Sequence, residues 1–253
     1  LLDRFLANKD VRENSKQTYK RQLKQFFDWL EKKEILNPSR EDILKYREDF
    51  LDSGLAPITA SAYVLAVQHL YTWLESEGLS TNHAKNIKSL RQPKGFRKDA
   101  LSLNQAKTLL DCFDMTTIQG IRDFAIVNLM IRTGMREIEV VRADISDIRQ
   151  ATTRTSILCI QGKGMNSKDE IVILTEETLK PIKDYLKIIG MTKDYSPLFV
   201  SLSDRNNVST RSISRIVKQA LRKIGIDTHR ITAHSLRHSA VTFCLLNGGS
   251  IQE

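Results

Sequence analysis

A histidine and an arginine stand three residues apart in the segment Thr-Ala-His-Ser-Leu-Arg-His-Ser, residues 232–239. On a helix this spacing places His234 and Arg237 on the same face. Together they offer a side chain that exchanges protons near neutral pH and a planar cation that is always charged, a combination suited to a phosphate group. His238 points elsewhere at that spacing, and we interpret it as structural.

A second arginine follows the segment 121–132, which is apolar on nearly every side and leads into Thr-Gly-Met. Such a pattern predicts a buried helix that ends at Gly134. Arg136 then falls in the first turn of the next element, and Glu139, one turn further on, is placed to hold its guanidinium group. Two interpretations stay open: an arginine that reaches a functional site, or an arginine in a local ion pair.

A lysine lies between two glycines in Gln-Gly-Lys-Gly, residues 161–164, directly after a β-rich run. Flanking glycines free the backbone and allow Lys163 to stand out from a hairpin tip. Lys168, further along the same tip, is an equally good candidate from the residues alone. A solvated loop lysine is the third interpretation of either residue.

The charge balance indicates a polyanionic partner. The 253 residues carry a formal net charge of +9, and residues 205–237 contain eight basic side chains and one acidic one, Asp227. Nucleic acid is the first partner that such an excess predicts, and an acidic membrane surface is the second. No apolar stretch is long enough to span a bilayer, and the start of the chain is charged too early for a signal peptide, so we expect a cytoplasmic protein.

Several common chemistries leave no trace in the sequence. There is no phosphate-binding P-loop, no glycine-rich dinucleotide turn, no nucleophile elbow and no cluster of carboxylates for two metal ions. The three cysteines lie far apart and have no metal-ligand spacing. We therefore expect neither a metal nor a cofactor.

The elements that must position these side chains fall into two predicted domains. Residues 1–90 show helical spacing, with helices that begin near Asn14 or Ser15, at Ser39 and at Thr59. Residues 91–99 combine proline, glycine and four basic residues and predict a linker. Residues 100–253 predict an α+β domain. Its expected elements are the buried helix, a β-hairpin from 156–160 and 171–174, a short strand at 198–200, a basic helix from Ser209 or Thr210 to about Ile224, and a helix from about Thr232 to Leu246. The fold class predicted is mainly α with a small antiparallel β-sheet.

Taken in order, Gly-Met-Arg136-Glu-Ile-Glu139, Gly-Lys163-Gly and His234-Ser-Leu-Arg237-His-Ser resemble the catalytic domain of tyrosine recombinases, especially Xer-like and transposon or phage integrases. The layout is also similar to this family, with a helical core-binding (SAM-like) domain before a basic linker. The resemblance spans nearly the whole chain. It implies a bacterial enzyme of a mobile element that integrates or recombines DNA at specific sites.

The resemblance also implies roles for individual residues. Arg136 and Arg237 would bind the non-bridging oxygens of the scissile phosphate, Lys163 would protonate the leaving 5′-oxygen, and His234 would assist proton transfer around the nucleophile. A tyrosine would attack the phosphate and form a 3′-phosphotyrosine intermediate.

The sequence departs from the family pattern in three places. Ser235 replaces the common acidic residue inside His-x-x-Arg, and the hairpin tip is one residue longer than usual, which keeps Lys168 as the alternative catalytic lysine. The six tyrosines all lie upstream of His-x-x-Arg, and the family places its nucleophile downstream of that motif. We therefore expect the nucleophile to lie beyond Glu253, and the chain as given to bind DNA without cleaving it.

The partners implied are double-stranded DNA and further copies of the chain, as a tetramer on two DNA sites. Candidates for contacts with the DNA backbone are Lys94, Arg97, Lys98, Arg211, Arg215 and Lys218. The alternatives are a type IB topoisomerase-like enzyme, a catalytically inactive DNA-binding regulator with the same fold, and a basic two-domain protein with an unrelated partner.

Overall fold

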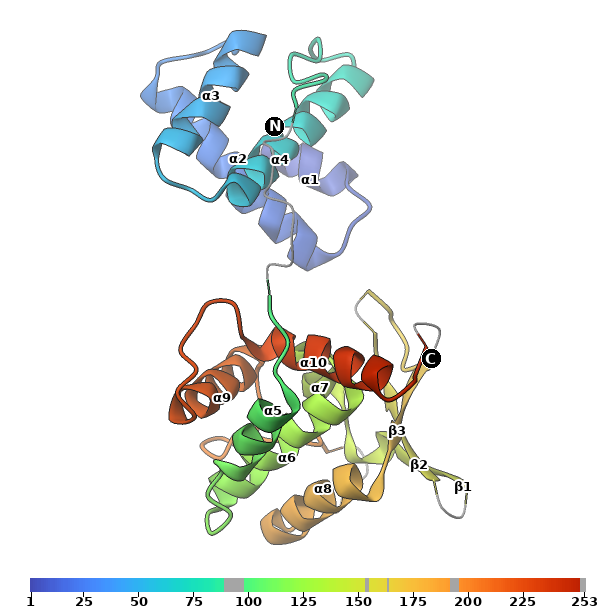
Figure 1. Cartoon of the computed structure of the whole chain (residues 1–253). Helices are drawn as coiled ribbons and strands as arrows, with labels where there is room; N and C mark the ends of the chain where they lie inside the picture. The colour runs from blue at the N-terminus through green and yellow to red at the C-terminus, as the bar shows by residue number, and fades with distance from the viewer. Residues whose placement is uncertain (89–97, 153–154, 163, 192–195, 251–253) are drawn as a thin grey trace. The chain divides into compact units, whose positions relative to one another are not determined.

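The computed structural model describes residues 1–88, 98–152, 155–162, 164–191 and 196–250. The chain forms two compact units, Leu1–Gly95 and Phe96–Glu253 (Figure 1). Helices dominate both, and a three-stranded antiparallel sheet lies in the second. This confirms the predicted fold class.

The first unit is helical throughout its described part. Its elements are α1 (Leu2–Asn8), α2 (Glu13–Lys32), α3 (Arg40–Asp52) and α4 (Pro57–Ser76). Ser39 caps α3, as predicted. Its hydroxyl accepts a hydrogen bond from the Asp42 amide, and the Asp42 carboxylate accepts one from the Ser39 amide. Helix α4 begins at Pro57 and not at Thr59. Proline is tolerated in the first turn because the N–H that it lacks would have no partner within the helix.

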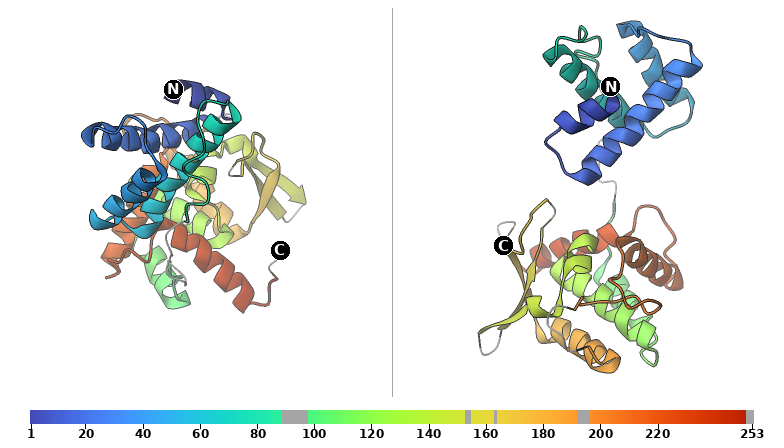
Figure 2. Two further views of the ribbon diagram at one scale, coloured as in Figure 1. Left: turned by 90° about the horizontal axis from the view of Figure 1, so that it is seen from above. Right: turned by 180° about the vertical axis from the view of Figure 1, so that it is seen from behind.

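The second unit is built around the buried helix that the sequence predicts. This helix is α6 (Ile118–Thr133), and Gly134 ends it in the left-handed conformation at φ 69°. Figures 1 and 2 show the neighbouring helices gathered around it. They are α5 (Leu103–Asp111), α7 (Glu137–Arg142), α8 (Glu176–Ile189), α9 (Thr210–Lys223) and α10 (Ala233–Leu246).

The sheet lies at one side of this helical core. Strand β2 (Thr155–Ile160) pairs with β3 (Glu170–Leu174), which confirms the predicted hairpin, and with β1 (Ile148–Thr152). Strand β1 escapes sequence-based prediction because Ile-Arg-Gln-Ala-Thr has no run of apolar residues. The strand predicted at 198–200 is wrong: Val200 makes one isolated bridge with Asn207, and the segment forms no ladder.

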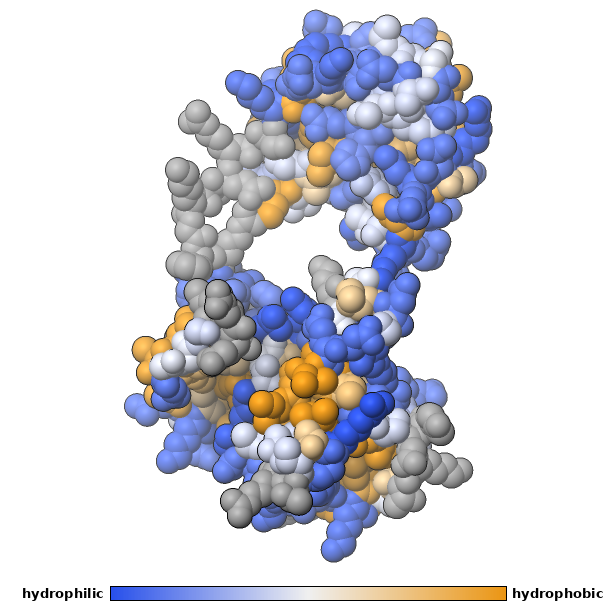
Figure 3. All heavy atoms as spheres, turned by 90° about the vertical axis from the view of Figure 1, so that its right-hand side faces the viewer, coloured by the Kyte–Doolittle hydropathy of each residue, from blue (hydrophilic) through white to orange (hydrophobic). Residues whose placement is uncertain are grey.

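The outer face of β3 remains accessible. Ile171 and Ile173 expose 59% and 64% of their surface, whereas Leu174 is buried in the core. Figure 3 views the side of the second unit that carries the sheet and shows apolar surface among hydrophilic residues there.

Candidate active site

Three of the predicted site residues line one pocket of about 290 Å³ in the second unit. Arg136 comes from the corner between α6 and α7, and His234 and Arg237 come from the first turns of α10. Thr210, the first residue of α9, lines the same pocket. Residues that are about 100 positions apart in the sequence therefore meet at a single hollow that is rich in positive charge.

Glu139 holds Arg136 from beneath the pocket. Its carboxylate accepts the Arg136 backbone amide at 2.7 Å and Arg136 Nη1 at 2.5 Å. The Glu139 side chain is 1% exposed, whereas that of Arg136 is 37% exposed. A buried carboxylate thus holds one side of the guanidinium group, and Arg136 lines the pocket. Arg136 therefore fits both interpretations from the sequence. It forms a local ion pair with Glu139, and it also lines the pocket.

Arg237 is tied to the same corner by a backbone contact. Its Nη1 donates to the carbonyl oxygen of Gly134 at 2.7 Å. A side-chain carbon at Gly134 would lie 3.4 Å from the Ala240 Cβ, and the positive φ at this position also favours glycine. The contact links the end of α6 to the face of α10 that carries Arg237, so both guanidinium groups are oriented by one glycine-containing turn.

His234 lies at the mouth of the pocket, beside a second histidine. The rings of His234 and His238 meet edge to face, with centroids 4.9 Å apart. His238 contacts His234 because residues four apart on a helix are neighbours, but it does not line the pocket. Partial burial lowers the pKa of His234, and the nearby His238, Arg237 and Arg136 lower it further. Glu137 opposes this effect without reversing it, so His234 is neutral at neutral pH.

The lowered pKa gives a prediction for the pH dependence of DNA cleavage. A neutral His234 accepts a proton, and this form persists on acidification until the pH reaches its pKa, below the ordinary value of about 6.5. We expect the acidic limb of the pH–rate profile for cleavage to lie below that value. A limb above it in wild type, or an unchanged limb in His234→Gln, would contradict the assignment.

The two candidate lysines differ in what the structure describes. Lys163 lies outside the described residues. The Lys168 ammonium group donates to Asp144 Oδ2 at 2.7 Å and to Asp147 Oδ2. Burial acts to lower the pKa of Lys168, but the two hydrogen bonds and the two negative charges outweigh it and raise that pKa. An ammonium group held by two carboxylates is a poor proton donor.

One pocket residue escaped sequence analysis. Glu137 lines the pocket beside Arg136, and its carboxylate accepts a hydrogen bond from the Ser214 hydroxyl on α9. In the sequence, only the position of Glu137 next to Arg136 indicated that it could lie at the pocket. The contact joins the first turn of α7 to the first turns of α9 and so helps to close the pocket.

The basic residues of α9 form an exposed stripe. Arg211, Arg215 and Lys218 are exposed, whereas the opposite face of the helix, with Ile213 and Val217, is buried. Spacings of four and three residues place all three cations on one side. Lys98 is placed differently, since its ammonium group donates to the carbonyl oxygen of His229. Lys94 and Arg97 lie outside the described residues.

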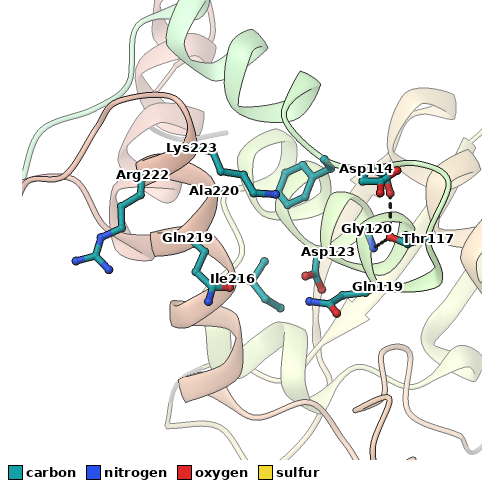
Figure 4. Close-up of a pocket in the computed structure, with 11 residues that line it drawn as sticks. Asp114, Thr117, Gln119, Gly120, Asp123, Ile216, Gln219, Ala220, Arg222 and Lys223 are labelled. Carbon is teal, nitrogen blue, oxygen red and sulfur yellow. Dashed lines mark hydrogen bonds between the residues drawn. The ribbon is translucent and has the colours of Figure 1, made fainter.

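A larger hollow, of about 700 Å³, lies between the start of α6 and α9 (Figure 4). Its lining has mixed charge, with Asp114 and Asp123 from the α6 side and Arg222 and Lys223 from α9, and it includes none of Arg136, His234 and Arg237. The candidate active site is therefore the smaller of the two.

Within the described residues no tyrosine of the second unit is available as a nucleophile. Tyr185 is buried, and its hydroxyl accepts the Val200 amide at 3.3 Å. Tyr195 lies outside the described residues. The other four belong to the first unit and contribute to its hydrophobic core: Tyr19, Tyr46, Tyr63 and Tyr71.

No helix in the described part of the chain is long and apolar enough to cross a bilayer. No group of three or more histidine, cysteine, aspartate or glutamate side chains in the described segments could hold a metal ion.

Comparison with known families agrees with this arrangement of elements. Residues 99–253 match the phage integrase family, and residues 2–87 match the phage integrase N-terminal SAM-like domain. The chain therefore belongs to the phage integrase family, whose members include the tyrosine recombinases.

Relatives that align with most of the chain are tyrosine recombinases. It is 28% identical to tyrosine recombinase XerD of Rickettsia conorii, over 98% of this chain and 85% of that one. It is 30% identical to tyrosine recombinase XerC of Myxococcus xanthus, over 80% of this chain and 69% of that one. The crystal structure of XerA recombinase is 27% identical and aligns with a TM-score of 0.52 over 99% of this chain and 85% of that one. A lambda integrase dimer bound to a core site has the same fold, with a TM-score of 0.77 at 15% identity over 98% of this chain and 89% of that one.

Proposed function

We propose that this protein breaks and rejoins DNA strands at specific sites, with Arg136 and Arg237 binding the phosphate at which the strand is cut. The observation that carries the proposal is the single pocket shared by Arg136, His234 and Arg237. Negative charge spreads over the phosphate oxygens in the transition state, and guanidinium groups held in advance stabilise it. Glu139 and the Gly134 carbonyl hold the two groups in this way.

The reaction proposed is that of the tyrosine recombinases to which the chain is similar. A tyrosine oxygen attacks the phosphorus while the 5′-oxygen leaves and takes up a proton, which yields a 3′-phosphotyrosine and a free 5′-hydroxyl. A 5′-hydroxyl from another strand then attacks the same phosphorus, and the tyrosine leaves. One phosphodiester is exchanged for another, so the reaction needs no ATP. His234, neutral beside the pocket, accepts a proton near the nucleophile.

We assign the proton for the leaving oxygen to Lys163. We prefer Lys163 to Lys168 because the Lys168 ammonium group is bound to Asp144 and Asp147, which raises the pKa of Lys168. A lysine in that state releases its proton less readily than an unpaired one. For the nucleophile we propose a tyrosine outside the six in this sequence, which agrees with the burial of Tyr185.

The partner proposed is double-stranded DNA, with the α9 stripe of Arg211, Arg215 and Lys218 on its backbone. Solved neighbours with this fold include a lambda integrase dimer on a core site and a lambda integrase tetramer on a Holliday junction. By analogy we propose a tetramer on two DNA sites, residues 1–90 as the core-binding domain, and residues 91–99 as a linker with Lys94, Arg97 and Lys98 near the backbone. We further propose a cytoplasmic protein.

Strand exchange tests the proposal against its alternatives. The protein is incubated with two DNA molecules that both carry its recombination site. One is short and labelled, and the other is longer and unlabelled. We expect labelled DNA of recombinant length. Relaxation of supercoiled plasmid with no recombinant DNA would instead favour a topoisomerase, and binding without either reaction would favour a regulator.

The α9 stripe predicts a change in the salt dependence of DNA binding. Each phosphate neutralised contributes about 0.9 to the slope of log K against log salt concentration. Replacing Arg211, Arg215 and Lys218 by glutamine should lower the magnitude of the slope by roughly 2 to 3, measured by fluorescence anisotropy from low to high salt. The control removes three exposed lysines of α8 (Lys180, Lys183 and Lys187), and an equal change there would contradict a specific contact.

A further inference from the structure

Lys168 takes part in an ion cluster that joins the β2–β3 hairpin tip to another element. Its ammonium group contacts Asp144 Oδ2 at 2.7 Å and also Asp147 Oδ2. The Asp147 side chain is 8% exposed, against 28% for Lys168 and 34% for Asp144. Such charge-assisted hydrogen bonds are among the stronger polar contacts, especially where one partner is buried.

The two carboxylates are themselves fixed in place. They stand at the start and end of a short 3₁₀ turn, η1 (Ile145–Asp147), which follows α7. The Asp144 amide donates to Asp147 Oδ2 at 2.7 Å, and the Asp147 amide donates to the Asp144 carbonyl at 3.1 Å. Because α7 carries Glu139 and directly follows Arg136, the cluster lies a few residues along the chain from the arginine side of the pocket.

The other end of the hairpin tip is held by contacts of its own. The Gln161 side-chain amide donates to the Met165 carbonyl at 2.8 Å, and the Met165 amide donates to the Gly162 carbonyl at 3.1 Å. Gly162 is buried, and a side-chain carbon there would lie 2.3 Å from the Glu170 carboxylate. The described contacts therefore fix the chain on both sides of Lys163.

We propose that Lys168 is a positioning residue for DNA cleavage: its ion pairs with Asp144 and Asp147 fasten the hairpin tip to η1 and so set where Lys163 presents its proton to the leaving oxygen. This inference rests on the proposed function. Residues 161–169 connect the two strands, and without the ion pairs such a segment would sample many arrangements. A displacement of about 1 Å in a catalytic group can lower a rate by roughly 100-fold.

The test compares two leaving groups in single-turnover cleavage by the intact protein. One DNA has the natural 5′-oxygen at the scissile phosphate, and the other has sulfur in its place. A thiolate leaves without a proton, so cleavage of the sulfur substrate does not depend on the lysine that protonates the oxygen. We expect Lys168→Met to slow the oxygen substrate by about 10- to 100-fold and the sulfur substrate by less than about 3-fold.

Matched variants separate positioning from a general defect. Lys168→Arg retains the charge and should recover most of the rate, and Lys183→Met, at an exposed lysine of α8, should leave both substrates unaffected. In a Lys163→Ala background, Lys168→Met should cause little further loss, because the two residues act through one proton transfer. Equal slowing of both substrates by Lys168→Met, or no slowing of either, would overturn the proposal.

A second readout does not depend on catalysis. Limited proteolysis reports local opening of the tip, so Lys168→Met should speed trypsin cleavage after Lys163 several-fold under conditions in which the rest of the second unit stays folded. Unchanged proteolysis would overturn the anchoring. Absence of cleavage of either DNA by wild type would count against the proposed function, and the proteolysis would still test the ion cluster.

Discussion

Replacing Arg237 by alanine is expected to lower the rate of DNA cleavage by about 100- to 1000-fold. One N–H of its guanidinium group is held by the Gly134 carbonyl, and the rest of the group lines the pocket with Arg136. Removing it takes away a donor placed where charge builds up on the phosphate. Single-turnover formation of the covalent protein–DNA adduct measures the rate, and DNA affinity should fall only modestly.

Two variants give this prediction its controls. Arg237→Lys keeps the positive charge but loses the planar set of donors, so we expect it to recover little of the rate. Lys187→Ala removes an exposed lysine of α8, and cleavage should then be nearly normal. If Arg237→Ala abolished DNA binding outright, Arg237 would be a docking residue and its catalytic assignment would be wrong.

Glu139→Ala is expected to slow cleavage by about 100-fold although Glu139 is buried beneath the phosphate site. The substitution leaves Arg136 without the carboxylate that binds both its amide and its Nη1. The guanidinium group of Arg136 is then no longer held in one orientation. Loss of the buried hydrogen bonds should also lower the free energy of unfolding by about 1–3 kcal/mol, measured by urea denaturation.

Glu176→Ala is the matched control, since it removes an exposed glutamate from the first turn of α8. It should change neither rate nor stability appreciably. A Glu139→Ala protein that unfolds more easily but cleaves at the normal rate would show that the carboxylate stabilises the fold without orienting Arg136.

Local patterns in the sequence were enough to predict much of the second unit. Apolar residues on nearly every face identify α6, and Gly134 marks its end. Spacing alone places His234 beside Arg237 on α10. These predictions succeed because helix periodicity and capping depend on residues a few positions apart.

Contacts between distant elements lay beyond such patterns. Glu137 meets Ser214 across 77 residues, and Lys168 meets Asp144 across 24. From the sequence alone Lys163 and Lys168 were equal candidates, because nothing in it indicated the two carboxylates that bind Lys168. Strand β1 was missed for a related reason, since its polar residues form a strand only by pairing with β2.

The most direct measurement is the identity of the residue that becomes linked to DNA. The protein is mixed with its recombination site, nicked so that the cleaved end diffuses away, and the adduct is digested and sequenced by mass spectrometry. We predict a 3′-phosphate joined to a tyrosine other than the six in this sequence, and no adduct from an Arg136→Ala, Arg237→Ala double variant. Absence of an adduct from the wild-type protein, or an adduct on Tyr185 or another of the six, would contradict the active site described around Arg136 and Arg237.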